Sequence, residues 1–298
     1  MNILITGANG FIGQHLSARL LSRGYDVSGL SLKVPSPATL PFKDYYQQDI
    51  SKSFVLNAYF DVVIHLAAYN ITNVGAKDGA LYTAVNVEGT RHLLQAVGAK
   101  RFIYLSTAKV YKDEGLPMVE NSPLSPQGAY AESKVKAEEV CRDHVEKESL
   151  VILRSVNVMG WGQAPKAVLP VFYQRAKSHQ PLDIMHPAHR PMQFVYVEDL
   201  IDAFEALITV GDEVGGTPAG GIFNIAHEES FTLEQLARAI ITMTHSSSVL
   251  NIPKDAGADH VFSPVICAKA YQRLGWKAQT GIARILELYD REYANASH

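Results

Sequence analysis

The sequence predicts an α/β protein that is built on a doubly wound, mainly parallel sheet. Two observations lead to this prediction. Short β-rich segments alternate with helical segments through the first half of the chain, which is the order that strand–helix–strand units produce. In addition, the segment Val62–Leu66 is apolar at every position except His65, as expected for a strand that helices cover on both faces.

The predicted elements follow one another in a regular order along this first half. A strand at Asn2–Thr6 precedes a helix at about Phe11–Ser22, and further strands follow at Asp26–Leu30 and Asp61–Leu66. Two amphipathic helices then alternate with two more strands, in the order Gly79–Val97, Arg101–Ser106, Ala129–Lys147 and Leu150–Arg154. Because helices alternate with strands through most of this half, we expect the strands of residues 1–158 to lie parallel in one sheet.

Beyond about Val158, glycines and prolines interrupt shorter elements, which indicates a second, smaller α/β region. The elements predicted there are two strands, a helix and a surface loop, at Gln193–Val197, Ile222–Ile225, Leu233–Thr244 and Gly215–Gly221 respectively. We expect parts of residues 193–226 to complete the main sheet. Residues 159–298 are then mainly a substrate-binding region.

Composition and charge narrow the classes of partner. With 47% hydrophobic and 19% charged residues, the chain has the composition of a globular protein, and its net charge of −3 provides no broad basic field for nucleic acid or an anionic membrane. The apolar opening is too short for a signal segment and no stretch is long enough to span a membrane, so we expect a cytoplasmic protein. Cys141 and Cys267 lie far apart without metal-ligand spacing, so we predict neither a metal site nor a disulfide.

The strongest functional motif is the glycine-rich turn TGANGFIG, in which Gly7, Gly10 and Gly13 link the first strand to the first helix. Glycines allow a tight turn and a close approach of the backbone to a pyrophosphate, while the helix N-terminus offers free N–H groups to the anion. Because the turn follows a strand and opens a helix, we predict that residues 1–158 form a Rossmann domain that binds a dinucleotide.

A second motif, YAESK, places Tyr130 and Lys134 four residues apart on a predicted helix. Positions four apart lie on one helix face, so the phenol and the ammonium can point into the same site. A free tyrosine has a pKa near 10, and a neighbouring cation lowers that pKa by stabilising the phenolate. Such a pair is common on helix surfaces, and only the glycine-rich turn upstream makes it a candidate for acid–base chemistry.

The third feature is the pair Ser106 and Thr107 at the end of the predicted strand RFIYLS. Ligands of open α/β sheets bind at the carboxyl ends of the strands, where these side chains emerge. A hydroxyl at this edge can hydrogen-bond to a substrate oxygen. Serine and threonine are ordinary residues at strand ends, so this feature gains weight only beside the tyrosine and the lysine.

Together these features resemble the short-chain dehydrogenase/reductase superfamily, and within it the extended branch, the NAD-dependent epimerase/dehydratase family that acts on sugar nucleotides. The resemblance covers most of the chain. Besides TGANGFIG, the matching pieces are HLAA (His65–Ala68), NVEGT (Asn86–Thr90), LSTAKVY (Leu105–Tyr111), YAESK (Tyr130–Lys134), RSVNVMG (Arg154–Gly160), FVYVEDL (Phe194–Leu200), FNIA (Phe223–Ala226) and LGW (Leu274–Trp276). Their order and spacing are specific for the family and much less so for one reaction.

The resemblance implies a role for each candidate residue. Tyr130 would be the acid–base group, Lys134 would hold the nicotinamide ribose and lower the pKa of Tyr130, and Thr107 would hydrogen-bond to the reacting oxygen at C4 of a sugar. The residues implied in cofactor binding are Gly7, Gly10, Phe11, Ile12 and Gly13 in the turn, Asp49 and Ile50 near the adenine, and Leu66, Ala67 and Ala68 along the cleft. By analogy, two chains would pair as a homodimer through the helices Gly79–Val97 and Ala129–Lys147.

One departure from the family pattern concerns the cofactor. NAD-binding relatives carry an acidic residue at the end of the second strand, where it binds the ribose hydroxyls. This chain has Ser31 there, with Lys33 close by. A hydroxyl and a lysine suit a 2′-phosphate better than an aspartate does, so the sequence favours NADP(H) over NAD. Alternatively, Lys33 is an ordinary solvated lysine.

A second departure concerns the reaction. The family's 4,6-dehydratases follow the threonine with an Asp-Glu pair that performs the elimination, whereas this chain has Ala108 and Lys109. We therefore expect a 4-keto-sugar reductase, with a UDP-hexose 4-epimerase as the alternative. A non-catalytic relative that senses a dinucleotide is an alternative of another class. It is disfavoured because such proteins typically lose the tyrosine or the lysine.

The substrate side of the motif pattern is less complete. Sugar-nucleotide epimerases usually carry an arginine directly before the aromatic strand, where this chain has Met192, and another arginine near the C-terminal part, where HVFSPVIC has none. Arg190 is therefore our candidate for binding the diphosphate, and Asn157 in RSVNVMG is a second substrate-binding candidate. A smaller ketone substrate stays open as an alternative.

Overall fold

The computed structural model describes residues 1–34, 41–71, 79–184, 189–213, 220–252 and 262–296. In chain order its elements are β1 (Asn2–Thr6), α1 (Phe11–Ser22), β2 (Asp26–Ser31), β3 (Tyr45–Gln47), β4 (Ala58–His65), α2 (Gly79–Tyr82), the π-helical turn η2 (Thr83–Glu88), α3 (Gly89–Ala96), β5 (Val97–Thr107), the 3₁₀ turn η3 (Ala108–Val110), α4 (Gly128–His144), β6 (Leu150–Ser155), β7 (Asn157–Met159), α5 (Val168–Lys177), β8 (Leu182–Asp183), β9 (Met192–Tyr196), α6 (Val197–Glu213), β10 (Gly221–Ile225), β11 (Ser230–Phe231), α7 (Leu233–Met243), β12 (Leu250–Asn251), α8 (Ala268–Leu274) and α9 (Ile282–Ala296).

A seven-stranded parallel sheet forms the centre of the fold, with the strand order β10-β6-β5-β4-β1-β2-β3. From β1 the chain builds outward to β2 and β3, and then returns to the other side of β1 at β4. This reversal between β1 and β4 is the point at which a doubly wound sheet forms its ligand crevice, outside the carboxyl ends of the strands. The predicted Rossmann fold is thus confirmed.

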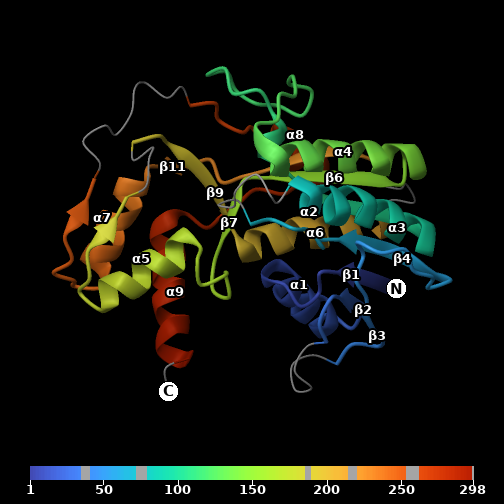
Figure 1. The fold of residues 1–298 in the computed structure, drawn as a ribbon, viewed down its shortest axis with the longest axis horizontal. Coiled ribbons are helices and arrows are strands. Elements are labelled where there is room, and N and C mark those ends of the chain that lie inside the picture. The colour runs from blue at the N-terminus through green and yellow to red at the C-terminus, as the bar shows by residue number, and fades with distance from the viewer. Residues whose placement is uncertain (35–40, 72–78, 185–188, 214–219, 253–261, 297–298) are drawn as a thin grey trace.

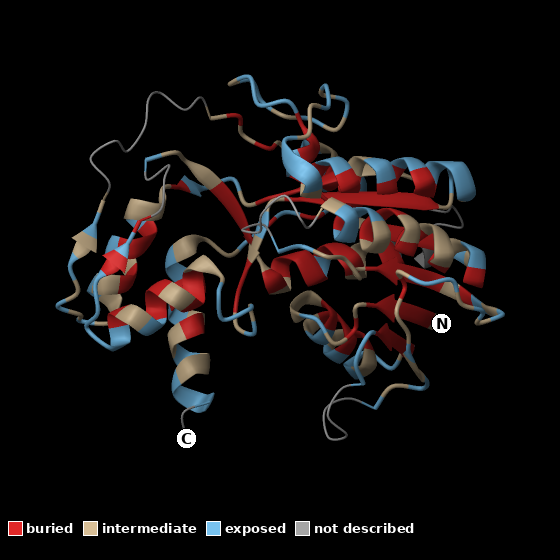
Figure 2. Ribbon diagram, in the orientation of Figure 1, coloured by how far each residue is buried: buried red, intermediate tan, exposed pale blue. Residues whose placement is uncertain are grey.

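Helices cover both faces of the sheet, and Figure 1 shows α4 and α3 on one side of it and α1 on the other. On the α1 side, Leu16 and Leu20 pack with Leu200 and Phe204 of α6 against the sheet. On the opposite side, Leu93 of α3 and residues of α4 form a second apolar layer. The central strands are mostly buried toward their carboxyl ends (Figure 2), which is why these parts of their sequences are apolar runs.

The C-terminal region gathers α5, α7 and α9 away from the sheet (Figure 1), around their own apolar cluster. Of residues 193–226, which were expected to contribute parts of the main sheet, one strand does so. Gly221–Ile225 joins the main sheet beside β6, but Met192–Tyr196 pairs with β7 and β11 in a separate three-stranded sheet. The predicted loop at 215–221 lies largely outside the described residues.

The two regions are interleaved along the chain. The 17-residue helix α6 directly follows β9 and returns to the main sheet, where its residues Leu200, Phe204 and Leu207 are fully buried. Ala270 and Trp276, close to the C-terminus, join the same cluster. The sequence analysis did not identify α6, because its apolar start continues the preceding strand without a turn signal. A division at residue 158 therefore does not separate the sheet from the rest of the chain.

In the described part of the chain, no helix combines the length and the apolar character that crossing a membrane requires.

Candidate active site

The glycine-rich turn packs against the end of β4. Gly7 has a φ of +68°, and a Cβ on it would lie 2.9 Å from the backbone nitrogen of Ala67. A Cβ on Gly13 would lie 2.2 Å from the carbonyl oxygen of Gly7, closer than any real contact. Gly7 thus supplies the conformation of the turn, and Gly13 lets α1 approach it closely. Ala67 and its neighbours Leu66 and Ala68 are half-buried beside the turn.

The N-terminus of α1 suits an anion such as a pyrophosphate. Gly10 is its N-cap residue and provides no side-chain cap, and no acidic residue occupies the first turn. Phe11 and Ile12 begin the helix, so the positive end of its dipole and the N–H groups of its first turn remain available to a phosphate. These residues therefore fit the cofactor that the sequence motif predicts.

Ser31, at the end of β2, has a structural role that the sequence did not reveal. Its side chain is buried, and its Oγ accepts a hydrogen bond from the N–H of Asn9 at 3.1 Å. Ser31 therefore holds the glycine-rich turn, which reduces what its hydroxyl can offer to a 2′-phosphate. Lys33 is exposed two residues later, and its carbonyl oxygen accepts a hydrogen bond from the hydroxyl of Tyr45.

Asp49 and Ile50, expected near the adenine, follow β3 at the edge of the sheet. Asp49 accepts hydrogen bonds from the backbone N–H and the hydroxyl of Ser51, and these bonds hold its pKa below the ordinary value. Ile50 is buried, and its side chain packs so closely on α3 that a Cβ on Gly89 would lie 2.9 Å from it. The side chain of Ile50 thus serves the core, and contact of either residue with a cofactor stays a prediction.

Beneath the turn lies a buried hydrogen-bond chain that we call the histidine network, formed by Thr6, His65, Thr90 and Asn86. The hydroxyl of Thr90 donates to the carbonyl oxygen of Asn86 at 2.6 Å, so its oxygen can only accept from Nε2 of His65, at 3.0 Å. Nδ1 of His65 is then the acceptor for the hydroxyl of Thr6 at 2.6 Å. The oxygen of Thr6 accepts in turn from the N–H of Ala67 at 3.2 Å.

The histidine network is electrically neutral. Burial, and secondly the charge of Lys134, lower the pKa of His65 to about 3. The network continues through the side chain of Asn86, which bonds to both backbone groups of Tyr69 and to Oγ of Ser133. Asn86 lies in the π-helical turn η2, a distortion that is frequent at functional sites. Through Ser133, which donates to the carbonyl oxygen of Tyr130, the network reaches the YAESK helix.

Tyr130 and Thr107 meet at the carboxyl end of β5. Their side chains are hydrogen-bonded to each other. Burial raises the pKa of Tyr130 to about 12, although the bond to Thr107 acts in the opposite direction. Tyr130 is therefore protonated at neutral pH. The structure thus brings together two of the residues that the sequence placed on different elements.

Lys134 lies one helical turn after Tyr130 but faces the sheet. Its side chain is buried, Nζ donates to the carbonyl oxygen of Leu105 at 2.6 Å, and it lies 4.1 Å from the ring centre of Tyr104. Burial lowers the pKa of Lys134 to about 7, against the attraction of Glu138. The sequence analysis expected Lys134 to lower the pKa of Tyr130. In this structure burial dominates instead, and Lys134 is not among the groups that shift that pKa.

On the other side of Lys134 lies a second buried cluster, which we call the glutamate network: Glu138, Arg154, Ser106 and Arg142. Arg154 donates to both carboxylate oxygens of Glu138, at 3.0 and 2.7 Å, and both side chains are buried. Ser106 donates at 2.6 Å and Arg142 at 2.7 Å. Burial alone would raise the pKa of Glu138, but these donors hold it below the ordinary value.

The glutamate network corrects one expectation from the sequence. Ser106 was a candidate for hydrogen bonding to substrate, but its hydroxyl points to Glu138 and it is buried. Only Thr107 of the pair meets Tyr130. The sequence analysis missed Glu138 and Arg154 as members of the site. Their signal was a charged residue within an otherwise apolar buried strand, LVILRS, and a glutamate one turn after Lys134.

The two substrate candidates lie apart from this cluster. Asn157 is exposed at the start of β7, opposite Phe194 of β9. Arg190 is half-exposed and forms an ion pair with Asp113, whose other carboxylate oxygen accepts from Ser263 at 2.6 Å. Arg190 is thus engaged with a carboxylate, and its binding to a diphosphate stays a prediction. Two residues of the arginine-free stretch HVFSPVIC, at 260 and 261, lie outside the described residues.

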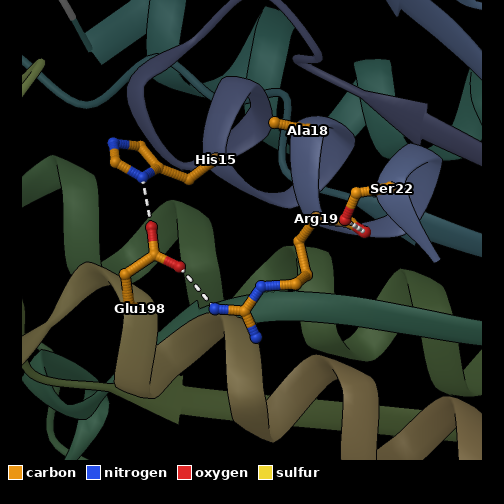
Figure 3. Close-up of a pocket in the computed structure, with 5 residues that line it drawn as sticks. All are labelled: His15, Ala18, Arg19, Ser22 and Glu198. Atoms are coloured by element: carbon orange, nitrogen blue, oxygen red, sulfur yellow. Dashed lines mark hydrogen bonds and ion pairs between the residues drawn. The ribbon is translucent and has the colours of Figure 1, made fainter.

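A shallow pocket lies between α1 and α6, lined by His15, Ala18, Arg19, Ser22 and Glu198 (Figure 3). Nδ1 of His15 contacts Glu198 at 2.5 Å, and its Nε2 contacts the carbonyl oxygen of Trp161 at 3.0 Å. Both partners are acceptors, so His15 must donate from both nitrogens and is charged. Burial alone would lower its pKa, but these two bonds raise it overall.

Comparisons with known proteins agree with this geometry. The profile of the NAD dependent epimerase/dehydratase family matches residues 3–226. Among curated proteins, the dTDP-D-glucose 4,6-dehydratase of Mus musculus is 29% identical over 325 residues, which cover 98% of this chain and 90% of that protein.

Two solved structures are similar over the whole length of both chains. The UDP-glucuronic acid 4-epimerase of Bacillus cereus, in complex with UDP-glucuronic acid and NAD, is 25% identical with a TM-score of 0.84, and both chains are covered completely. The UDP-glucose 4-epimerase of Thermotoga maritima, with UDP-glucose, is 25% identical with a TM-score of 0.82 and the same coverage.

Proposed function

The chain belongs to the NAD dependent epimerase/dehydratase family, a family of NAD-dependent enzymes, and we propose that it transfers a hydride at C4 of the hexose of a nucleotide sugar. The family resemblance read from the sequence motifs is thereby confirmed. The observation that supports this proposal best is the meeting of Thr107 and Tyr130 at the strand ends, with Lys134 beneath them. Thr107 and Tyr130 reach this edge of the sheet from different elements, and both present hydroxyl groups there.

In this proposal Thr107 and Tyr130 bind the oxygen at the reacting carbon. Tyr130 holds a proton at neutral pH and donates it to an oxygen that becomes negative when a ketone is reduced. In the reverse direction, Thr107 stabilises the tyrosine oxygen by its hydrogen bond. A bound nicotinamide cofactor supplies the hydride or accepts it. Burial lowers the pKa of Lys134, which lies beside this site, to about 7. Its ammonium form can stabilise negative charge that develops on the reacting oxygen.

Epimerisation at C4 is the reaction we favour, because two solved proteins that are similar over their whole length are named as 4-epimerases. Reduction of a 4-keto sugar, the reaction that the sequence analysis favoured, is the second candidate. It is supported by the protonated state of Tyr130, which fits a proton donor. Elimination of water is disfavoured, since Ala108 and Lys109 follow Thr107 and neither provides a carboxyl group.

The choice between NAD and NADP(H) rests on the end of β2. No acidic residue occurs between Asp26 and Asp44, so no carboxylate there repels a 2′-phosphate. Because Ser31 is committed to the glycine-rich turn, Lys33 alone supports the NADP(H) preference. Titration with both cofactors checks it: Lys33→Glu should shift the ratio of the two dissociation constants toward NAD.

The main test is turnover by the purified enzyme and by Tyr130→Phe, which keeps the ring and removes the proton. We expect the wild type either to interconvert the C4 epimers of a UDP-hexose with NAD, or to oxidise NADPH with a UDP- or dTDP-4-keto-6-deoxysugar. Tyr130→Phe should lower kcat by about 10²–10⁴-fold. Tyr82→Phe is the control at a neighbouring tyrosine: its ring lies 6.1 Å from that of Tyr130, its hydroxyl donates to the carbonyl oxygen of Ile71, and we expect the variant to keep most of the activity.

If the purified enzyme turned over neither of these two substrate classes, the proposal would be contradicted. If Tyr130→Phe also left the biological activity of the protein intact, the reading as a non-catalytic dinucleotide sensor would replace it. For the assembly, we propose the homodimer through α2, α3 and α4 that the family analogy implies, and the mass in solution by light scattering tests this point.

A further inference from the structure

Lys109 lies at the site described above but has no role in it so far. It is the middle residue of η3, the 3₁₀ turn that directly follows Thr107. Its backbone N–H donates to Oγ1 of Thr107 at 3.3 Å. The turn therefore fixes Lys109 two residues beyond Thr107, whose hydroxyl, in our proposed function, binds the oxygen at C4.

The charge of Lys109 is not balanced by the described part of the protein. Neighbouring cations are paired: Lys112 with Glu114, Arg190 with Asp113, and Arg154 with Glu138. No carboxylate of the described residues lies within 4.0 Å of Lys109, which is an unusual arrangement for a cation beside an active site.

Lys109 reaches solvent from between two buried residues. Ala108 and Val110, on either side of it, are buried, whereas Lys109 itself is exposed. Burial nevertheless lowers the pKa of its ammonium group, and no attraction from an acidic group opposes this effect. The ammonium group of Lys109 therefore lies where the described part of the protein gives it no anionic partner. A cation there gains most from an anion that a ligand brings.

The chemistry of a nucleotide sugar narrows the choice of that anion. Its diphosphate is attached at C1, across the ring from C4. In a hexuronic acid, a carboxylate is attached at C5, directly next to C4. With the C4 oxygen held by Thr107 and Tyr130, the carboxylate is the anionic group nearest to Lys109.

We propose, on the basis of the proposed function, that Lys109 is a specificity-determining residue that binds the C6 carboxylate of a nucleotide-linked hexuronic acid. The geometry that carries this proposal is the position of an unpaired cation two residues after Thr107, in the turn that Thr107 caps. A charge-assisted hydrogen bond of this kind changes affinity by about 10- to 100-fold. Hexoses with an uncharged hydroxymethyl group would lack this bond.

The test compares UDP-glucuronic acid with UDP-glucose in the presence of NAD, by isothermal titration calorimetry and by turnover. We expect the wild type to bind UDP-glucuronic acid more tightly. Lys109→Met should lower this preference by about 10-fold or more, Lys109→Glu should lower it further, and Lys109→Arg should retain most of it. Lys112→Met is the matched control: it removes a nearby cation that is paired with Glu114, and it should leave the preference unchanged.

The outcomes separate this inference from the proposed function. If the wild type binds both UDP sugars and Lys109→Met leaves the ratio of their dissociation constants unchanged, the inference is overturned and the proposed function stands. If the wild type binds neither sugar, both fail. Circular dichroism of each variant confirms that a loss of preference does not come from unfolding.

Discussion

The two buried networks on either side of Lys134 do similar structural work with opposite electrostatics. The histidine network joins Thr6, His65 and Thr90 through neutral groups, each of which donates one hydrogen bond and accepts another. The glutamate network joins Glu138 and Arg154 through full charges. Both tie helices to the carboxyl ends of the central strands, where the candidate site lies.

Lys134 interacts electrostatically with both networks. Burial, and secondly the charge of Lys134, lower the pKa of His65, whereas Glu138 raises the pKa of Lys134 against the larger effect of burial. A charged His65 would repel Lys134, whereas a charged Glu138 favours the ammonium against its burial. Burial, opposed in part by the attraction of Glu138, therefore brings the pKa of Lys134 to about 7, close to neutral pH. We infer that a neutral network is favourable beside Lys134 at His65 and a charged one at Glu138. Exchanging the two would place a cation, or no anion, next to the ammonium group.

The largest expected effect comes from breaking the ion pair of the glutamate network. Arg154→Met leaves Glu138 buried without its main donor, and we expect the free energy of unfolding to fall by about 3–5 kcal/mol. Urea denaturation measures this change. Arg142→Met is the matched control, because Arg142 donates to the same carboxylate from the surface and should cost about 1 kcal/mol or less. Equal costs for the two variants would show that burial does not distinguish the arginines.

Removing one hydroxyl from the histidine network should have a smaller effect. Thr90→Val keeps the shape of the side chain but leaves the Nε2–H of His65 without its acceptor, so the free energy of unfolding should fall by about 1–3 kcal/mol. Ser17→Ala provides the comparison: this buried hydroxyl of α1 has no hydrogen-bond partner in the described structure, and its removal should not destabilise the protein. A harmless Thr90→Val would argue against the hydrogen-bond chain.

The smallest expected effect concerns His15, which pairs with Glu198 (Figure 3). It provides a charged histidine to compare with the neutral His65. Its pKa in the folded protein is raised, so its contribution is complete below the unfolded pKa of about 6.5 and is lost as the pH rises through the folded value. We therefore compare the free energy of unfolding of the wild type with that of His15→Gln. As the pH rises over this range, the difference between them should decrease by about 1 kcal/mol or less.

His65 should behave in the opposite way. Its folded pKa of about 3 lies below the ordinary value, so its contribution is complete above about pH 6.5 and is lost as the pH falls toward 3. Titration of the two imidazole signals by NMR checks both signs together. A His65 signal that titrates near pH 6.5 in the folded protein would contradict the lowered pKa and show that the network is not held neutral.

The sequence by itself determined the features that depend on local order. The glycine-rich turn, the Tyr130–Lys134 pair and the placement of Thr107 at a strand end all follow from short segments, whose conformation neighbouring residues set. The parallel sheet followed as well, since its strands are apolar runs between helices.

Only the tertiary structure decided the partners of the buried polar groups. Ser31 holds Asn9, Ser106 donates to Glu138, and Arg190 pairs with Asp113, each across a large separation in the sequence. The physical reason is that a buried polar group must find its partner among whatever the fold brings within hydrogen-bond distance. Residue type shows that a partner is needed, but the packing of distant segments decides which one it is. The same packing set the pKa of Tyr130, because burial of its phenol outweighed the hydrogen bond to Thr107, and Lys134 is not among the groups that shift it.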